Sequence, residues 1–83
     1  MKIAVRYFAS LREVLGDGET VELESASTVA AVRDALAGRG GRHAEALGRT
    51  RALRSARNRV VCAEAEPVGE GDEIAFFPPV TGG

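Results

Sequence analysis

The residues with the clearest chemical potential end the chain, in the run Phe76-Phe77-Pro78-Pro79-Val80-Thr81-Gly82-Gly83. Proline lacks the N–H of a strand ladder, so a sheet must stop at Pro78 and Pro79, and polyproline geometry projects the next residues away from the domain. The six residues from Pro78 onward reach about 20 Å when extended. Because Gly82 and Gly83 have no Cβ, a narrow channel admits them. The terminal carboxylate of Gly83 is therefore the candidate reactive group.

Two other side chains have reactive atoms but lack the neighbours that reactions need. Cys62 is the only cysteine, which excludes an internal disulfide and suits a reducing, cytoplasmic compartment. No basic residue follows it closely to stabilise a thiolate, so packing as a small hydrophobe is favoured over carrying sulfur. His43 is the only histidine and is expected at the surface or at a helix cap, since one histidine forms neither a metal site nor a triad.

Metal and phosphate sites are not indicated elsewhere. Glu70, Asp72 and Glu73 stand together, but without the spaced oxygen ligands of a calcium loop they are better interpreted as an acidic turn. The glycine-rich segments 16–18 and 38–41 lack the lysine and hydroxyl spacing of a phosphate-binding loop. We expect no metal and no bound cofactor.

Length and composition bound the class of protein. The chain has 83 residues, of which 45% are hydrophobic and 28% charged, as in one ordinary soluble domain. No apolar run approaches the roughly 20 residues that span a bilayer, and the N-terminus enters an alternating pattern without the apolar region of a signal peptide. We expect no membrane partner.

The net charge of −1 conceals an asymmetry. Residues 39–59 hold seven arginines and one acid, whereas residues 60–83 hold five acids and no base. The arginines lack interleaved aromatic residues, so a solvated basic loop region is favoured over a nucleic-acid surface. The acidic end could steer the domain toward a basic partner.

Two strands are predicted near the N-terminus. Ile3, Val5 and Tyr7 alternate with more polar positions, which is the pattern of a strand with one buried face. Residues 20–24 alternate in the same way after a turn at residues 16–18. These two strands should pair.

Short helical pieces are expected in two places. Ser10 precedes Glu13 by three residues, which is the spacing of a capping box, and Gly16 would end that helix. Residues 39–42 are predicted as loop, and residues 43–47 as one helical turn.

One clear amphipathic helix follows the first two strands. Either Ser27 or Thr28 is a natural N-cap. Val29, Val32 and Leu36 then recur at i, i+3 and i+7, which places them on one face of a helix. This face should cover the sheet.

The remaining strands are expected at residues 53–57 and 60–62, around Asn58, and at residues 73–77, after a turn at residues 69–72. One helix against one mixed sheet of about five strands is a two-layer α+β arrangement, most simply a β-grasp, or ubiquitin-like, roll. We predict a domain over residues 1–77 and an extended, flexible C-terminal tail over residues 78–83.

Strand parity predicts an apolar surface on the uncovered face of the sheet. If Tyr7 and Phe76 point into the core, then Phe8 and Phe77 point outward. The first and last strands of a β-grasp are central neighbours, so these two rings should lie side by side, and Val61 could join them. This surface is the candidate partner interface.

The end of the chain resembles the C-terminal signature of the small subunits of molybdopterin synthase, a family of ubiquitin-like sulfur carriers. The similarity covers nearly the whole chain in the same order. It rests on Tyr7-Phe8-Ala9, Leu11-Arg12-Glu13, Thr28-Val29, Asn58 and the run Gly71-Asp72-Glu73-Ile74-Ala75-Phe76-Phe77-Pro78-Pro79-Val80-Thr81-Gly82-Gly83. Departures are Arg57, where relatives tend to carry an apolar residue, and the arginine-rich residues 49–59.

The resemblance implies a non-catalytic subunit that meets several partner proteins one after another. An activating enzyme would adenylate Gly83 with ATP, and sulfur from a donor protein would then replace AMP. The thiocarboxylate would enter the large subunit, within a heterotetramer whose catalytic residues lie in that other chain, and supply sulfur to cyclic pyranopterin monophosphate. The resemblance also implies that the apolar surface contacts both partners.

Three alternatives remain open at this point. The chain could carry sulfur for thiamine or cysteine synthesis, or it could be a ubiquitin-like modifier of lysines in other proteins. As a modifier it could extend side-chain chains of itself only from Lys2, its single lysine. A plain interaction domain is the third alternative, and it gives the diglycine no task.

Overall fold

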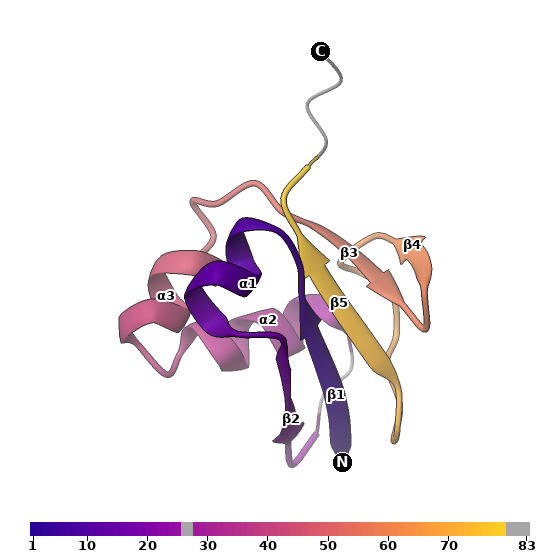
Figure 1. Cartoon of the computed structure of the whole chain (residues 1–83). Helices are drawn as coiled ribbons and strands as arrows, with labels where there is room; N and C mark the ends of the chain where they lie inside the picture. The colour runs from indigo at the N-terminus through magenta and orange to yellow at the C-terminus, as the bar shows by residue number, and fades with distance from the viewer. Residues whose placement is uncertain (26–27, 80–83) are drawn as a thin grey trace.

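The computed structural model describes residues 1–25 and 28–79, which form one mixed sheet and three helices (Figure 1). The elements follow in the order β1 (Lys2–Tyr7), α1 (Ser10–Leu15), β2 (Gly18–Glu22), α2 (Val29–Ala37), α3 (Gly41–Leu47), β3 (Arg54–Arg57), β4 (Val60–Cys62) and β5 (Glu73–Phe77). The strands lie in the order β2-β1-β5-β3-β4. β1 and β5 are parallel central neighbours and the other pairs are antiparallel, which confirms the predicted β-grasp arrangement.

The core lies between the sheet and the helices. Ile3, Val5, Tyr7, Ile74 and Phe76 from the two central strands are at most 1% exposed. They pack in one cluster with the α2 stripe Val29, Val32 and Leu36, and with buried residues of α1 and α3. The inward parity predicted for the first and last strands is therefore confirmed, and so is the face of the main helix.

β2 begins two residues earlier than predicted, because Gly18 belongs to the strand rather than to the preceding turn. Gly18 pairs with Arg6 in the antiparallel register. A Cβ at Gly18 would lie 2.3 Å from the carbonyl oxygen of Val5, which no side chain tolerates. The glycine thus permits close pairing of β1 and β2 and is not a turn signal.

The predicted capping box of α1 is wrong. The N-cap is Ala9, in the left-handed region at φ 54°, and no side chain caps this helix. The amides of Arg12 and Glu13 donate to the Ala9 carbonyl, so Ser10 is already the first helical residue and its hydroxyl is not at the cap position. For α2 the prediction holds, since the Thr28 hydroxyl accepts from the amide of Ala31 at 3.1 Å.

The arginine-rich segment is more ordered than the predicted solvated loop. α3 begins at Gly41, two residues before the expected helical turn. Arg49 pairs with Asp34 and Glu64, and Arg57 on β3 bonds to Asp72 and Glu66. Arg57 therefore stands in the strand as predicted, with its charge neutralised by acids of the C-terminal third.

Asn58 fixes the β3–β4 turn to the start of β5. Asn58 and Arg59 both adopt positive φ, 48° and 72°, as a tight hairpin with two central residues requires. The Asn58 side-chain Nδ2 donates to the Asp72 carboxylate at 3.0 Å, and its side-chain Oδ1 accepts from the backbone amide of Glu73 at 2.9 Å. These bonds hold the start of β5, whereas the prolines that follow Phe77 end it.

Candidate functional site

The base of the predicted tail lies at the end of a central strand. β5 ends at Phe77, beside α1 (Figure 1), and Pro78 and Pro79 follow it outside the sheet. Of the predicted tail residues only these two prolines are described. Val80, Thr81, Gly82 and Gly83 lie outside the described residues, so their role stays a prediction.

The structure brings Phe8, Val61 and Phe77 together on the outer face of the sheet, where they line one hollow of about 390 Å³. Phe8 is 42% exposed and Val61 is 57% exposed. Phe8 follows Tyr7, which pairs with Phe76, so Phe8 and Phe77 are neighbours across β1 and β5. We call these three side chains, with Ala56 and Ala75, the outer patch.

Small residues create the hollow in the outer patch. Ala75 pairs with Ala56, and Ala56 pairs with Val61, so two alanines form the floor between the aromatic rings and the valine. A partner side chain of moderate size can therefore enter between Phe77 and Val61, which favours docking of a complementary apolar group.

Charged side chains surround the apolar centre of the outer patch. Glu73 lies 3.9 Å from Arg6 and 3.7 Å from Arg59, measured between side-chain oxygen and nitrogen atoms. The Arg6 guanidinium also lies over the Phe8 ring, 5.7 Å from its centroid. An apolar centre with a charged, solvated border is the usual anatomy of a protein interface.

His43 is partly exposed on α3 and pairs with another side chain; the alternative of a helix cap is wrong, because the N-cap of α3 is Gly40. Its Nε2 lies 2.8 Å from Glu19 on β2, and the same carboxylate accepts from the Tyr7 hydroxyl at 2.7 Å and from Arg39. Burial alone would raise the pKa of Glu19, but the hydrogen bonds from His43, Arg39 and Tyr7 outweigh it and lower the pKa to about 2. This cluster ties α3 and the segment between α2 and α3 to β1 and β2, on the helix side of the sheet.

The lowered pKa of Glu19 should make the free energy of unfolding depend on pH. Its pKa is lower in the folded protein than its ordinary value of 4.5, so its contribution is complete above about pH 5 and is lost as the pH falls toward 2. We expect Glu19→Gln to lower the free energy of unfolding by about 1–2 kcal/mol at neutral pH, and this difference to shrink across that range. Urea unfolding of both proteins at several pH values measures it, and a difference independent of pH would contradict the assignment.

Cys62 packs as the sequence predicted for a structural cysteine. It is partly buried and contacts the hydrophobic core, and its carbonyl accepts from the Ser55 hydroxyl. Within residues 1–25 and 28–79, no cluster of His, Cys, Asp and Glu side chains could hold a metal ion. No helix among the same residues is long and apolar enough to cross a membrane.

Sequence reasoning missed a buried arginine and the loop that it holds. Arg33 is 4% exposed, and it donates to the carbonyls of Leu47, Gly48 and Arg51, each at 2.7 Å. A signal existed, because Arg33 stands four residues after Val29 and so on the apolar face of α2. The three carbonyls lie in a segment whose approach to α2 no local pattern indicates.

A family profile and a known relative both match this protein over nearly its whole length. The profile of the ThiS family matches residues 5–83. The chain is 41% identical over 81 residues to the molybdopterin synthase sulfur carrier subunit of Escherichia coli (strain K12), an alignment that covers 98% of this chain and 99% of the relative.

Two solved structures extend this likeness to the fold. Small archaeal modifier protein 1 of Haloferax volcanii is 31% identical, with 95% of this chain and 98% of that chain covered and a TM-score of 0.73. A complex of subunits 1 and 2 of the molybdopterin-converting factor from Helicobacter pylori contains a chain that is 25% identical, with both chains covered fully and a TM-score of 0.67. Because the family match begins within β1 and includes the terminal diglycine, the protein belongs to the ThiS family.

Proposed function

We propose that this protein is the sulfur-carrying small subunit of a molybdopterin synthase, working in the cytoplasm. The observation that carries the proposal is the nearly full-length match to a sulfur carrier subunit of that enzyme. The position of Pro78 and Pro79 directly after a central strand supports it, because two prolines end the ladder at the base of the predicted tail.

The chemistry of a backbone carboxylate explains why activation is needed. An α-carboxyl group with a pKa of about 3.5 is ionised at neutral pH and is a poor electrophile. An activating enzyme would join the Gly83 carboxylate to AMP from ATP, with release of pyrophosphate, which makes the carbonyl carbon reactive. Sulfur that a donor protein supplies at the oxidation level of sulfide would then attack this carbon, so that AMP leaves and a thiocarboxylate is formed. ATP is thus a substrate of the activating enzyme, and the carrier itself binds no cofactor.

The large subunit would supply the catalytic residues. It would receive the thiocarboxylate in its active site, where cyclic pyranopterin monophosphate accepts the sulfur, in an assembly of two copies of each subunit. Cationic groups there would stabilise the negative sulfur and the charge that develops during transfer. The two-subunit complex known for a relative supports a large-subunit partner.

Reconstitution tests this proposal. The protein is incubated with an activating enzyme, ATP and a sulfur source, and its intact mass is followed for exchange of one oxygen by sulfur. The large subunit and the pterin precursor are then added. We expect the sulfur to appear and then to be discharged; loading without discharge to the precursor would point to another sulfur pathway, such as thiamine or cysteine synthesis.

A second candidate function is conjugation to lysines of other proteins, which the name of the archaeal relative favours. The same Gly83 carboxylate would then form an isopeptide bond rather than a thiocarboxylate. Mass spectrometry of tryptic peptides from cells distinguishes the two, because a lysine-linked remnant of this tail on other proteins would be present only for a modifier.

Phe77 should contribute to binding more than to folding. Burial of one such side chain is worth about 1.5–3 kcal/mol, whereas association costs about 4–15 kcal/mol, so the outer patch gives only weak binding without the tail. We expect Phe77→Ala to raise the Kd for the large subunit by about 10- to 100-fold while lowering stability by less than about 1 kcal/mol. Calorimetric titration and thermal unfolding measure the two effects.

Phe76 is the matched control for Phe77, because it is the preceding residue on the same strand and is fully buried. Phe76→Ala should cost about 3–5 kcal/mol of stability. If Phe77→Ala showed the same large stability loss with unchanged affinity, Phe77 would belong to the core and not to an interface.

A further inference from the structure

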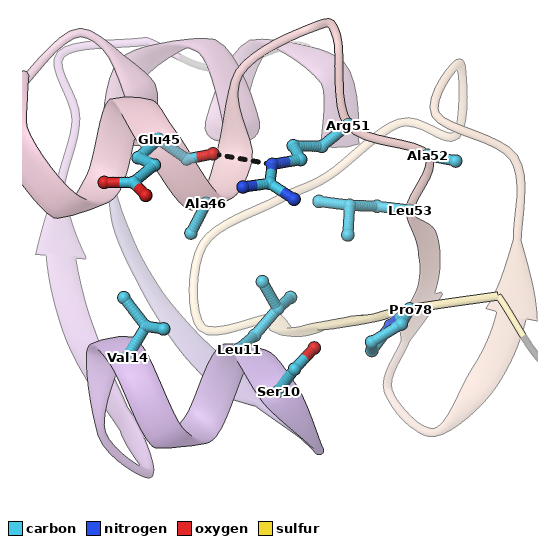
Figure 2. A pocket seen from close by; sticks show the side chains of 9 residues that line it. All are labelled: Ser10, Leu11, Val14, Glu45, Ala46, Arg51, Ala52, Leu53 and Pro78. Atoms are coloured by element: carbon cyan, nitrogen blue, oxygen red, sulfur yellow. Dashed lines mark hydrogen bonds between the residues drawn. The ribbon is translucent and has the colours of Figure 1, made fainter.

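A second apolar hollow lies at the base of the tail, on the helix side of the sheet (Figure 2). Its volume is about 310 Å³, near the lower limit for small-molecule sites, so it suits a few side chains better than a large ligand. α1, α3, the loop before β3 and the first tail residue form its walls. We call it the tail-base hollow; its principal lining residues are Leu11, Val14, Ala46, Arg51, Leu53 and Pro78.

The hollow is lined by exposed apolar surface and by the guanidinium of Arg51. Val14 is 42% exposed and lines the hollow, so its apolar side chain is accessible to a partner. The Nε of Arg51 donates to the Glu45 carbonyl at 3.0 Å. Figure 2 shows the other two guanidinium nitrogens facing the hollow, while the Glu45 carboxylate turns away from them. Arg51 can therefore donate two further hydrogen bonds into the hollow.

The wall that carries Arg51 is held in place before any partner arrives. The buried Arg33 donates to the carbonyls of Arg51 and Gly48, both at 2.7 Å, and it also contacts Glu64. A charged side chain that is nearly inaccessible thus fixes this loop from beneath. A partner that binds here need not order the loop backbone, which reduces the entropic cost of association.

The position of the hollow connects it with the outer patch. Phe77 lines the outer patch and Pro78, the next residue, lines the tail-base hollow. The two surfaces therefore adjoin at the point where the tail leaves the sheet, on opposite sides of the chain. A partner protein that encloses the tail from Pro78 onward would surround it on both sides. The part of the partner on the helix side would then contact the tail-base hollow.

We propose that the tail-base hollow is a second docking surface for the large subunit, which inserts an apolar side chain beside Val14 and a carboxylate that accepts from Arg51. This inference rests on the proposed carrier function. Arg51 is exposed at the edge of the mainly apolar hollow, which Glu45 also lines. A planar guanidinium with two parallel N–H groups matches a carboxylate in geometry and charge. The outer patch then provides one contact and the tail-base hollow another, which orients the domain while the tail is threaded.

Substitutions on the hollow test the inference in the complete two-subunit system. Arg51→Ala and Val14→Ser should each raise the Kd for the purified large subunit by about tenfold. The loss for Arg51→Ala should shrink as salt is raised, because the contact is partly electrostatic. The control is Arg42→Ala, which removes the same charge from an exposed position of α3 and should leave the Kd within about twofold.

Loading by the activating enzyme separates this inference from the proposed function. Both variants should be thiocarboxylated at the wild-type rate and should keep the wild-type circular dichroism spectrum. If both bind the large subunit as the control does, the inference is wrong while the carrier function stands. If they lose loading instead, the hollow contacts the activating enzyme and the inference is also wrong. Failure of the wild-type protein to load at all would contradict the proposed function itself.

Discussion

One alanine added after Gly83, and not cleaved off, is expected to lower the rate of molybdopterin formation by at least about 100-fold. The addition converts the Gly83 carboxylate into an amide, and it moves the new carboxylate about 3.5 Å further along the chain. An amide cannot be adenylated, and an alanine carries a Cβ where a narrow channel expects glycine. The rate of product formation in the reconstituted synthase measures the effect.

The extension should leave the domain intact, because the sheet ends at Phe77 and the core lies within residues 3–76. Its thermal midpoint is expected to match that of the wild type. The same residue added before Met1 is the control for a change of length. Product formation at the normal rate, by a protein whose intact mass shows that the added residue remains, would contradict a role for the terminal carboxylate.

Arg33→Met is expected to lower the free energy of unfolding by about 3 kcal/mol or more, a loss comparable with that expected for Phe76→Ala. The substitution keeps much of the side-chain volume but leaves the carbonyls of Leu47 and Gly48 without their donor. Buried acceptors without partners keep their full desolvation cost. For a domain of this size the midpoint of thermal unfolding should fall by more than about 10 °C.

Arg42→Met is the matched control for Arg33→Met, because Arg42 is an exposed arginine on the neighbouring helix α3. It should change stability by less than about 0.5 kcal/mol. If the two variants unfolded at the same temperature, water would have replaced the bonds of Arg33 at little cost. Arg33 could then not be what holds the wall of the tail-base hollow.

The topology was largely predictable because its strongest signals are periodic. Alternation at Ile3, Val5 and Tyr7 correctly predicted the buried face of β1, and the stripe Val29, Val32 and Leu36 predicted the face of α2. The order of strands then determined which outward side chains could meet. For this reason strand parity alone places Phe8 and Phe77 side by side, and their contact with a partner stays a prediction.

The errors arose where one residue type permits two local structures. Gly18 resembled a turn residue, yet it stands in β2 because only glycine fits against the Val5 carbonyl. Ser10 had the spacing of a cap, yet the backbone of Ala9 takes the left-handed conformation first. At Gly18 strand pairing thus explains the difference, whereas at Ser10 the helix begins one residue earlier than the cap spacing indicated.

The unpredicted contacts join residues distant in sequence. His43 and Glu19 are separated by 24 positions and Arg33 and Arg51 by 18, and no pattern within one element reveals such a pair. The tail-base hollow has the same origin, since α1, α3 and Pro78 meet only in the folded chain. Periodicity therefore identified the sheet and the main helix, whereas the polar connections between them required the structure.

The position of the transferred sulfur shows directly whether the protein carries it on its backbone terminus. The protein and its Cys62→Ser variant are loaded with an activating enzyme, ATP and a sulfur source, and tandem mass spectrometry then locates the added sulfur. We predict that both proteins carry one sulfur in place of one oxygen at Gly83, and that both lose it to the pterin precursor in the presence of the large subunit. Sulfur found on Cys62, with no loading of the Cys62→Ser variant, would contradict a carrier that works through its backbone terminus.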